Sequence, residues 1–137
     1  MSFFKTLQRQ PRIISLFTND LELNRSSKLI YQVLESQQNR DKNSSQYQIE
    51  IHDKFPTLDQ LKYMCSINPM AVKNQIPNLS TLIKKKTDER IFGSELKDCV
   101  KTGEWNDSGS VWVDWEKKRI GNDPLSIKTA LGELQGK

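Results

Sequence analysis

The run Ile-Ile-Ser-Leu-Phe at residues 13–17 constrains the fold of this chain more than any other feature of its sequence. It is bounded by Pro11 on one side and by the polar residues 18–20, Thr-Asn-Asp, on the other. Branched and aromatic side chains favour β-structure, and a short apolar run between turn signals is typical of a strand that is buried on both faces. We therefore expect residues 13–17 to form a central strand of a sheet.

The residues that follow predict a helix and then a second strand. Asn24, Ser26 or Ser27 can cap the helix, because each offers a side-chain oxygen to free backbone N–H groups. The apolar residues of this helix recur at helical spacing: Leu29, Ile30, Val33 and Leu34. After a polar loop at residues 40–45, apolar and polar residues alternate over residues 46–52, which is typical of an edge strand with one buried face. Together these elements predict a βαβ unit with a right-handed crossover.

The middle of the chain is expected to be helical. Thr57 caps a helix that ends before Pro69, and a shorter helix follows Pro77. A further helix at residues 94–103 contains Cys99 and closes at a glycine, as helices often do. This block of helices separates the βαβ unit from the end of the chain.

The last part of the chain predicts a hairpin and a final helix. Residues 111–115 are dense in aromatic and β-branched side chains, and residues 119–121 can return antiparallel to them. Asp123 and Pro124 then open a helix. The order β-α-β, helical insertion, β-β-α predicts an α/β protein with a thioredoxin-like, four-stranded mixed sheet and helices on both faces. We expect a single domain over residues 12–135.

The positive charge of the chain is concentrated at its N-terminus. Lysine and arginine total 21 against 17 acidic residues, a formal charge of +4, but three of the basic residues precede the first acid, Asp20. From Asp20 onward, 18 basic residues face 17 acidic residues, so this part of the chain is nearly neutral. The lysine triplet at residues 84–86 is typical of a solvated last helical turn. No nucleic-acid surface is therefore expected. The acid-free, amphipathic residues 1–11 are typical either of a mitochondrial targeting segment or of a frayed terminus that packs on the body.

Side chains that usually build metal and cofactor sites are scarce. The chain has two cysteines, Cys65 and Cys99, and one histidine, His52, so neither a disulfide framework nor a zinc site is expected. No apolar stretch approaches the roughly 20 residues of a membrane-spanning helix. His52 beside Asp53 could orient a proton transfer, but no nucleophile or second ligand is evident near it in the sequence, which favours a capping or exposed role.

Four colinear stretches of the chain carry a resemblance to a known family. They are MSFFKTLQRQPRIISLFTND, FPTLDQLKYM, QIPNL and the stretch from DCVKTGEWN through VWVDWEKKRIGN. In them the chain resembles a family of small fungal mitochondrial redox proteins with a thioredoxin-like fold. More distantly, FPTLDQL and the helical interval from Lys54 to Val111 resemble the arsenate reductase branch of these folds.

The resemblance implies a mitochondrial protein that reduces small, harmful oxidised molecules or disulfides through a single catalytic cysteine. The matching cysteine is Cys99, in DCVKTGEWN. The resemblance implies no bound cofactor, and glutathione or another thiol would act as external reductant. Two positions depart from the pattern of thioredoxins and arsenate reductases. The loop at residues 18–25 contains no cysteine, and Ser110 stands where a cis-proline often precedes the third strand.

The residues around Cys99 favour two opposite interpretations. Lys97 and Lys101 could favour a thiolate, but side chains two positions away on a helix do not share its face. Cys99 lies three residues after Leu96 on the apolar side, near a helix C-terminus whose dipole would raise the pKa of the thiol. Cys99 is therefore either a reactive thiol or an inert core thiol, and Cys65 is expected to be a packing residue.

Three functions are compatible with the sequence. The first is a monothiol oxidoreductase in which Cys99 attacks a disulfide or a small oxidant and an external thiol resolves the product. The second is a non-catalytic thioredoxin-fold module that binds a protein partner, not identified by the sequence, through its strand-helix face. The third is an arsenate-reductase-like enzyme, against which the missing cysteine in the first loop argues.

Overall fold

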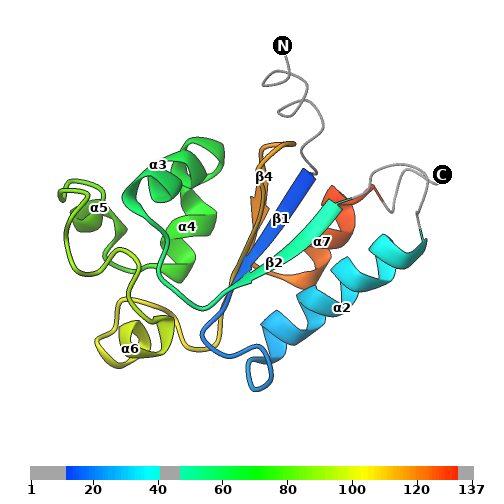
Figure 1. The fold of residues 1–137 in the computed structure, drawn as a ribbon, viewed down its shortest axis with the longest axis horizontal. Coiled ribbons are helices and arrows are strands. Elements are labelled where there is room, and N and C mark those ends of the chain that lie inside the picture. The colour runs from blue at the N-terminus through cyan, green and yellow to red at the C-terminus, as the bar shows by residue number, and fades with distance from the viewer. Residues whose placement is uncertain (1–11, 41–46, 133–137) are drawn as a thin grey trace, which may run out of the picture.

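Four strands form one mixed sheet in a computed structural model that describes residues 12–40 and 47–132. They are β1 (Arg12–Phe17), β2 (Tyr47–His52), β3 (Val111–Asp114) and β4 (Arg119–Gly121). The order across the sheet is β2-β1-β3-β4; β1 runs parallel to β2 and antiparallel to β3, and β4 is antiparallel to β3 (Figure 1). The predicted α/β class and four-stranded mixed sheet are confirmed, and the thioredoxin-like relationship stays a prediction.

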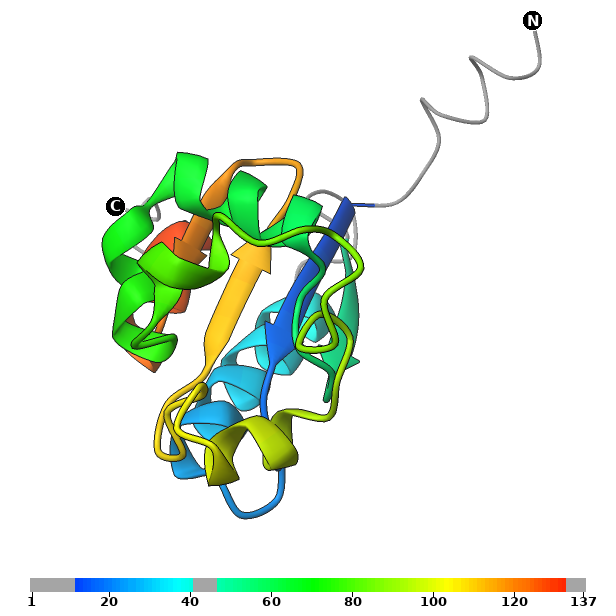
Figure 2. The same ribbon diagram turned by 90° about the vertical axis from the view of Figure 1, so that its left-hand side faces the viewer.

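Six helices in the described part of the chain cover both faces of the sheet. They are α2 (Arg25–Arg40), α3 (Leu58–Ile67), α4 (Pro69–Gln75), α5 (Leu79–Leu82), α6 (Leu96–Lys101) and α7 (Pro124–Ala130). Helices α3 to α6 lie on one face, and α2 and α7 lie on the other (Figures 1 and 2). The segment predicted as a targeting sequence, residues 1–11, lies outside the described residues, as do residues 133–135 of the predicted domain.

Strand β1 is buried on both faces, as its sequence predicts. Ile14 and Leu16 are fully buried and point towards α2 and α7, whereas Ser15 and Phe17, each 1% exposed, face the other side. Neighbouring strands flank β1 on both edges, because it pairs with β2 and with β3. Residues 13–17 are therefore the central strand that the apolar run predicts.

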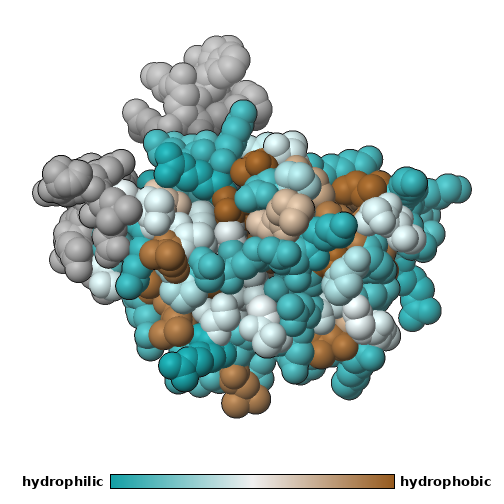
Figure 3. Space-filling view, turned by 180° about the vertical axis from the view of Figure 1, so that it is seen from behind, coloured by the Kyte–Doolittle hydropathy of each residue, from teal (hydrophilic) through white to brown (hydrophobic). Residues whose placement is uncertain are grey.

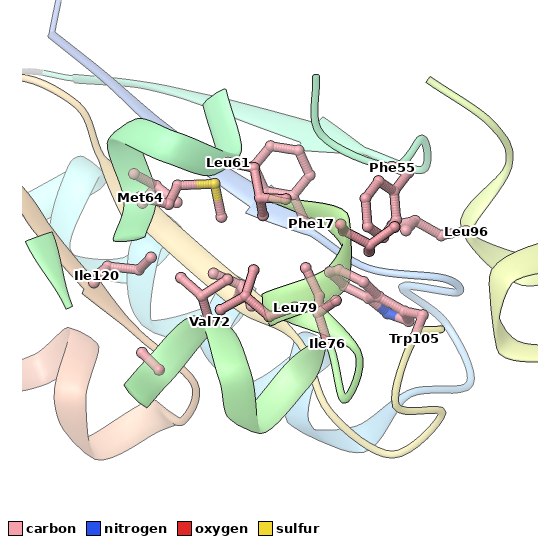
Figure 4. Close-up of a cluster of buried hydrophobic side chains, with 14 of the residues drawn as sticks. Phe17, Phe55, Leu61, Met64, Val72, Ile76, Leu79, Leu96, Trp105 and Ile120 are labelled. Atoms are coloured by element: carbon pink, nitrogen blue, oxygen red, sulfur yellow. The ribbon is translucent and has the colours of Figure 1, made fainter. Parts of the chain in front are cut away.

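Two hydrophobic cores fill the spaces between the sheet and its helices. The first core lies under α3 to α6 and includes the residues labelled in Figure 4: Phe17, Phe55, Leu61, Met64, Val72, Ile76, Leu79, Leu96, Trp105 and Ile120. The second core lies under α2 and α7 and consists of Ile14, Leu16, Ile30, Leu34, Tyr47, Trp112 and Ile127. In the first core the rings of Phe55 and Trp105 meet edge to face with centroids 6.2 Å apart, a favourable geometry for aromatic pairs.

Side-chain caps fix where several helices begin. Of the three candidates for α2, the structure uses Asn24, whose Oδ1 accepts a hydrogen bond from Ser27 N at 3.0 Å. Thr57 and Asp123 form capping boxes at α3 and α7, and Asn68 caps α4 through two backbone N–H groups. Such caps satisfy N–H groups that have no partner within the helix, so the starts of α2, α3 and α7 could be predicted from the sequence. The separate helix α4 was not predicted.

Two apolar residues are exposed, one on the predicted buried face of β2 and one in the last helix. Ile51 in β2 is 40% exposed, because β2 is an edge strand with a neighbour on one side only. By contrast, Tyr47 at the start of β2 is buried, and its hydroxyl donates to the Leu34 carbonyl at 2.6 Å. Leu125 in α7 is 71% exposed, while Ile127 is the residue of that helix that reaches the core.

The surface seen from behind is mostly hydrophilic, with hydrophobic side chains in scattered patches (Figure 3). In the described part of the chain, no helix has both the length and the apolar character needed to cross a membrane.

A buried ion pair ties the first residue of β1 to the end of β3. The Arg12 guanidinium donates to Asp114 Oδ2 from Nε at 3.0 Å and from Nη2 at 2.6 Å, and these side chains are only 10% and 2% exposed. The same guanidinium lies 5.5 Å from the ring centre of Tyr47, at the start of β2. Asp114 Oδ1 accepts a further hydrogen bond from Lys117 N, so the pair also fixes the β3–β4 turn.

Arg12→Ala should lower the free energy of unfolding by about 3–5 kcal/mol, because it leaves the Asp114 carboxylate buried without its partner. The matched control is Lys101→Ala, which breaks the exposed Lys101–Asp98 pair and should leave the stability nearly unchanged. Urea unfolding followed by tryptophan fluorescence measures both. An Arg12→Ala variant as stable as the control would contradict the role assigned to the buried pair.

Candidate functional site

Cys99 lies in the short helix α6 and is 2% exposed. Its carbonyl accepts hydrogen bonds from the backbone N–H groups of Glu104 at 2.8 Å and of Trp105 at 3.2 Å. The turn that makes these contacts possible passes through Gly103, whose φ of +81° is a left-handed conformation that glycine adopts without strain. The end of α6 is therefore folded back on Cys99.

The thiol of Cys99 faces the hydroxyl of Ser94. The two atoms, Sγ and Oγ, are 3.3 Å apart, and Ser94 Oγ also lies 2.6 Å from the Ile91 carbonyl, to which it donates. A serine hydroxyl carries one proton, so while that proton is directed to Ile91 the thiol is the donor towards Ser94. A Ser94 hydroxyl that turns towards the sulfur donates to it instead, and a hydrogen bond of this kind favours the thiolate.

Burial raises the pKa of the Cys99 thiol. The hydrogen bond with Ser94 lowers this pKa, whereas the carboxylates of Glu104 and Asp98 raise it further. Lys101 does not offset this rise in the pKa of Cys99, because its ammonium lies 3.9 Å from the Asp98 carboxylate and is paired with it. At neutral pH the thiolate fraction of Cys99 is therefore smaller than that of a free cysteine.

An open cavity of about 370 Å³ gives access to the region of Cys99. Its lining consists of Arg90, Ile91, Ser94, Asp98, Cys99, Thr102 and Glu104. The Glu104 carboxylate is held by a 2.7 Å hydrogen bond from Thr102 Oγ1. Since Cys99 lines this cavity but is only 2% exposed, its side chain lies at the inner wall. A small molecule that entered the cavity would approach the thiol past two acids and one arginine.

Cys65 is a half-buried thiol on α3 that packs against the first core. Burial also raises the pKa of this thiol. The structure describes Cys65 and Cys99 as free cysteines, with no disulfide between them. A packing role for Cys65 is therefore in keeping with its surroundings.

The loop between β1 and α2, where thioredoxins place their nucleophile, is a closed polar network here. The amide of Asn24 donates to the carbonyls of Asp107 at 3.0 Å and of Gly109 at 2.9 Å. Ser110, which the resemblance to thioredoxin-like proteins compares with an often cis proline, is fully buried, and no peptide bond in the described residues is cis. These polar groups satisfy one another and hold the loop against the segment before β3.

His52 has partners that its sequence neighbours do not reveal. Its Nε2 lies 3.1 Å from Ser15 Oγ and 3.2 Å from Glu50 Oε1, and its ring stacks on Phe17 with centroids 4.7 Å apart. Asp53, which the sequence suggests as its partner, instead lies 3.7 Å from the Lys54 ammonium. Among the residues that the structure describes, no three His, Cys, Asp or Glu side chains lie close enough together to hold a metal ion.

Sequence reasoning missed the residues that surround Cys99 in space. Ser94, Arg90 and Ile91 come from the segment before α6, and Glu104 comes from the turn after it. No local pattern marks any of them, because their meeting depends on how α6 and its flanking turns fold back on one another. The match of Cys99 itself came from the family resemblance and not from periodicity.

Comparison with known proteins gives matches over nearly the whole chain. Residues 4–123 match the family described as "Protein of unknown function (DUF1687)". The chain is similar to "Putative redox protein FMP46, mitochondrial" from Candida glabrata, with 50% identity over 96% of this chain and 98% of the relative. The protein of that name from Saccharomyces cerevisiae is 45% identical over 93% of this chain and 94% of the relative.

A solved structure also matches. It is the solution NMR structure of protein YKR049C from Saccharomyces cerevisiae, which is 45% identical to this chain. The match covers 93% of this chain and 95% of that chain, with a TM-score of 0.51. The likeness in sequence and structure therefore extends over the sheet, the helical block and the segment that contains Cys99.

Glu104→Gln should speed the alkylation of Cys99 at pH 8 by on the order of threefold, because removing a nearby negative charge favours the thiolate. Glutamine keeps an oxygen that can accept from Thr102. The measurement is the iodoacetamide rate at each cysteine of the folded protein, resolved by mass spectrometry. Glu89→Gln is the matched control, since Glu89 is not among the charges that act on Cys99.

The pH dependence gives a second readout of the same experiment. A raised pKa means that the wild-type rate at Cys99 reaches half of its maximum above about pH 8.5, the pH at which an unperturbed cysteine is half ionised. A half-maximal rate at or below that pH, or a rate that Glu104→Gln leaves unchanged, would contradict these electrostatics.

Proposed function

Because the chain belongs to the DUF1687 family, with relatives named "Putative redox protein FMP46, mitochondrial", we propose that it is a mitochondrial thiol redox protein that acts through Cys99. The observation that carries the proposal is the position of Cys99 at the inner wall of an open cavity. A core thiol without such a cavity would have no route to a substrate. The names of the relatives support the redox role and the location.

The reaction with a disulfide needs one cysteine and one external thiol. The Cys99 thiol loses its proton, and the thiolate attacks one sulfur of the disulfide. A Cys99–S–S–R bond forms, the original S–S bond breaks, and the other half leaves as a thiolate that takes up a proton. Glutathione or another external thiol, as its thiolate, then attacks the R sulfur of the mixed disulfide. A new S–S bond forms between R and the external thiol, the Cys99–S bond breaks, and Cys99 leaves as a thiolate that takes up a proton. Resolution by an external thiol is in keeping with Cys65 and Cys99 being free in the structure.

A small oxidant with a transferable oxygen would follow a parallel route. The Cys99 thiolate takes the oxygen and becomes a sulfenic acid, while the oxidant is reduced by two electrons. One external thiol converts the sulfenic acid into a mixed disulfide and water. A second external thiol then restores the Cys99 thiol and leaves as a disulfide. The cavity of about 370 Å³ suits substrates of small size.

The alternative proposal is a non-catalytic binding module of thioredoxin-like fold. It is favoured by one specific observation, the 2% exposure of Cys99, together with the direction of its pKa shift. In this alternative Cys99 fills the first core, as free cysteines often do, and the function depends on a protein partner.

A glutathione-coupled assay with hydroxyethyl disulfide separates the two proposals. The redox proposal predicts that Cys99→Ser abolishes turnover and that Cys65→Ser keeps it within roughly twofold, because the thiolate is the nucleophile. Circular dichroism checks that both variants are folded. Equal turnover in wild type and Cys99→Ser, or no turnover above the uncatalysed rate in wild type, would overturn the redox proposal and leave the binding module.

A further inference from the structure

A second cavity lies along the edge strand β4. Its volume is about 490 Å³, and its lining comes from β4 and β3, from α7 and from the junction between α3 and α4. In Figure 2 the green helices α3 and α4 lie in front of the orange strand β4, and the red helix α7 lies behind it. None of its lining residues is shared with the cavity beside Cys99.

The floor of this cavity is apolar and held in place. The Trp112 residue is 1% exposed. Its indole Nε1 donates a hydrogen bond to Ser126 Oγ at 2.9 Å, so this N–H group already has a partner within the protein. Gly121 permits this contact, because a Cβ there would overlap with both Ser126 Oγ and Trp112 Nε1. Ile120 and the 71% exposed Leu125 add further apolar surface. The cavity therefore offers a preformed apolar surface.

Arg119 provides an unpaired positive charge at this cavity. One of its guanidinium N–H groups donates to the Ala130 carbonyl at 3.2 Å, which anchors the side chain against the end of α7. Within residues 12–40 and 47–132, no carboxylate forms an ion pair with Arg119. The acid that also lines the cavity, Asp123, is engaged as the cap of α7, since its Oδ1 accepts from Ser126 N at 2.8 Å.

We propose that this cavity binds an amphipathic monocarboxylate, a small molecule with an apolar body and one carboxylate group. The apolar body would lie on Trp112, Ile120 and Leu125, and the carboxylate would accept hydrogen bonds from Arg119. A guanidinium presents paired N–H donors that match the two oxygens of a carboxylate. The volume is within the range of small-molecule sites, which combine apolar walls with a few fixed polar groups. This site is independent of the redox proposal for Cys99.

Sodium octanoate is the probe, titrated into the ¹⁵N-labelled full chain up to millimolar concentration. The expected result is a saturable shift of the Trp112 indole N–H and of the backbone N–H groups of Ile120 and Ser126. Octan-1-ol, which has the same apolar chain without the charge, should bind roughly tenfold more weakly, because it lacks the charge-assisted hydrogen bonds. Octyltrimethylammonium should bind no better than the alcohol.

Two matched variants test the role of Arg119. Arg119→Gln removes the charge at the cavity and should weaken octanoate binding roughly tenfold. Lys128→Gln removes a charge from α7 at a residue that lines a different cavity, and it should leave the affinity unchanged. Both residues are exposed, so both variants are expected to fold.

Any of four outcomes would overturn the proposal. The first is the absence of a saturable shift at these resonances, and the second is shifts centred elsewhere in the protein. The third is equal affinity for octanoate and octan-1-ol, and the fourth is no loss of affinity in Arg119→Gln. Either of the last two would mean that the cavity recognises apolar chains and not carboxylates.

Discussion

Burial of β1 on both of its faces is the constraint on which the rest of the structure depends. Ile14 and Leu16 need a cover on one side and Phe17 needs one on the other, and each large apolar side chain stabilises the fold by about 1.5–3 kcal/mol when buried. Helices must therefore dock on both faces, which gives the two cores. The polar residue within the strand, Ser15, lies 2.8 Å from Trp115 Nε1 and 3.1 Å from His52 Nε2, so its hydroxyl is satisfied inside the first core.

The elements of the fold could be predicted because their signals are local. The cap of α2 at Asn24, the capping box at Thr57 and the strand at residues 13–17 each depend on side chains close together in the sequence. Exposure was harder to predict, since Ile51 belongs to the apolar face of the predicted edge strand and is still 40% exposed. The buried partner of Arg12, Asp114, lies 102 residues away, and no local pattern connects them.

The chemistry of the candidate site could likewise be predicted only in part, because it depends on contacts between residues that are not neighbours in the sequence. The sequence placed Cys99 near the end of a helix, but only the fold brings Ser94 and the carboxylate of Glu104 beside it. Burial and the carboxylates of Glu104 and Asp98 raise the pKa of the thiol against the opposing effect of Ser94. A redox role therefore requires a substrate that reaches the inner wall of the cavity and a thiolate that forms there as a minor species. Cysteine can sustain this, because it remains nucleophilic when only a small fraction is ionised.

The most direct test of the redox account is whether Cys99 forms a mixed disulfide in the folded protein. Native protein would be incubated with hydroxyethyl disulfide at neutral pH, quenched with acid and analysed by intact mass and peptide mapping, before and after addition of glutathione. The account predicts one adduct, located on Cys99, that glutathione removes. A Cys99 that stays unmodified until denaturant is added would contradict the account and identify this residue as part of the core.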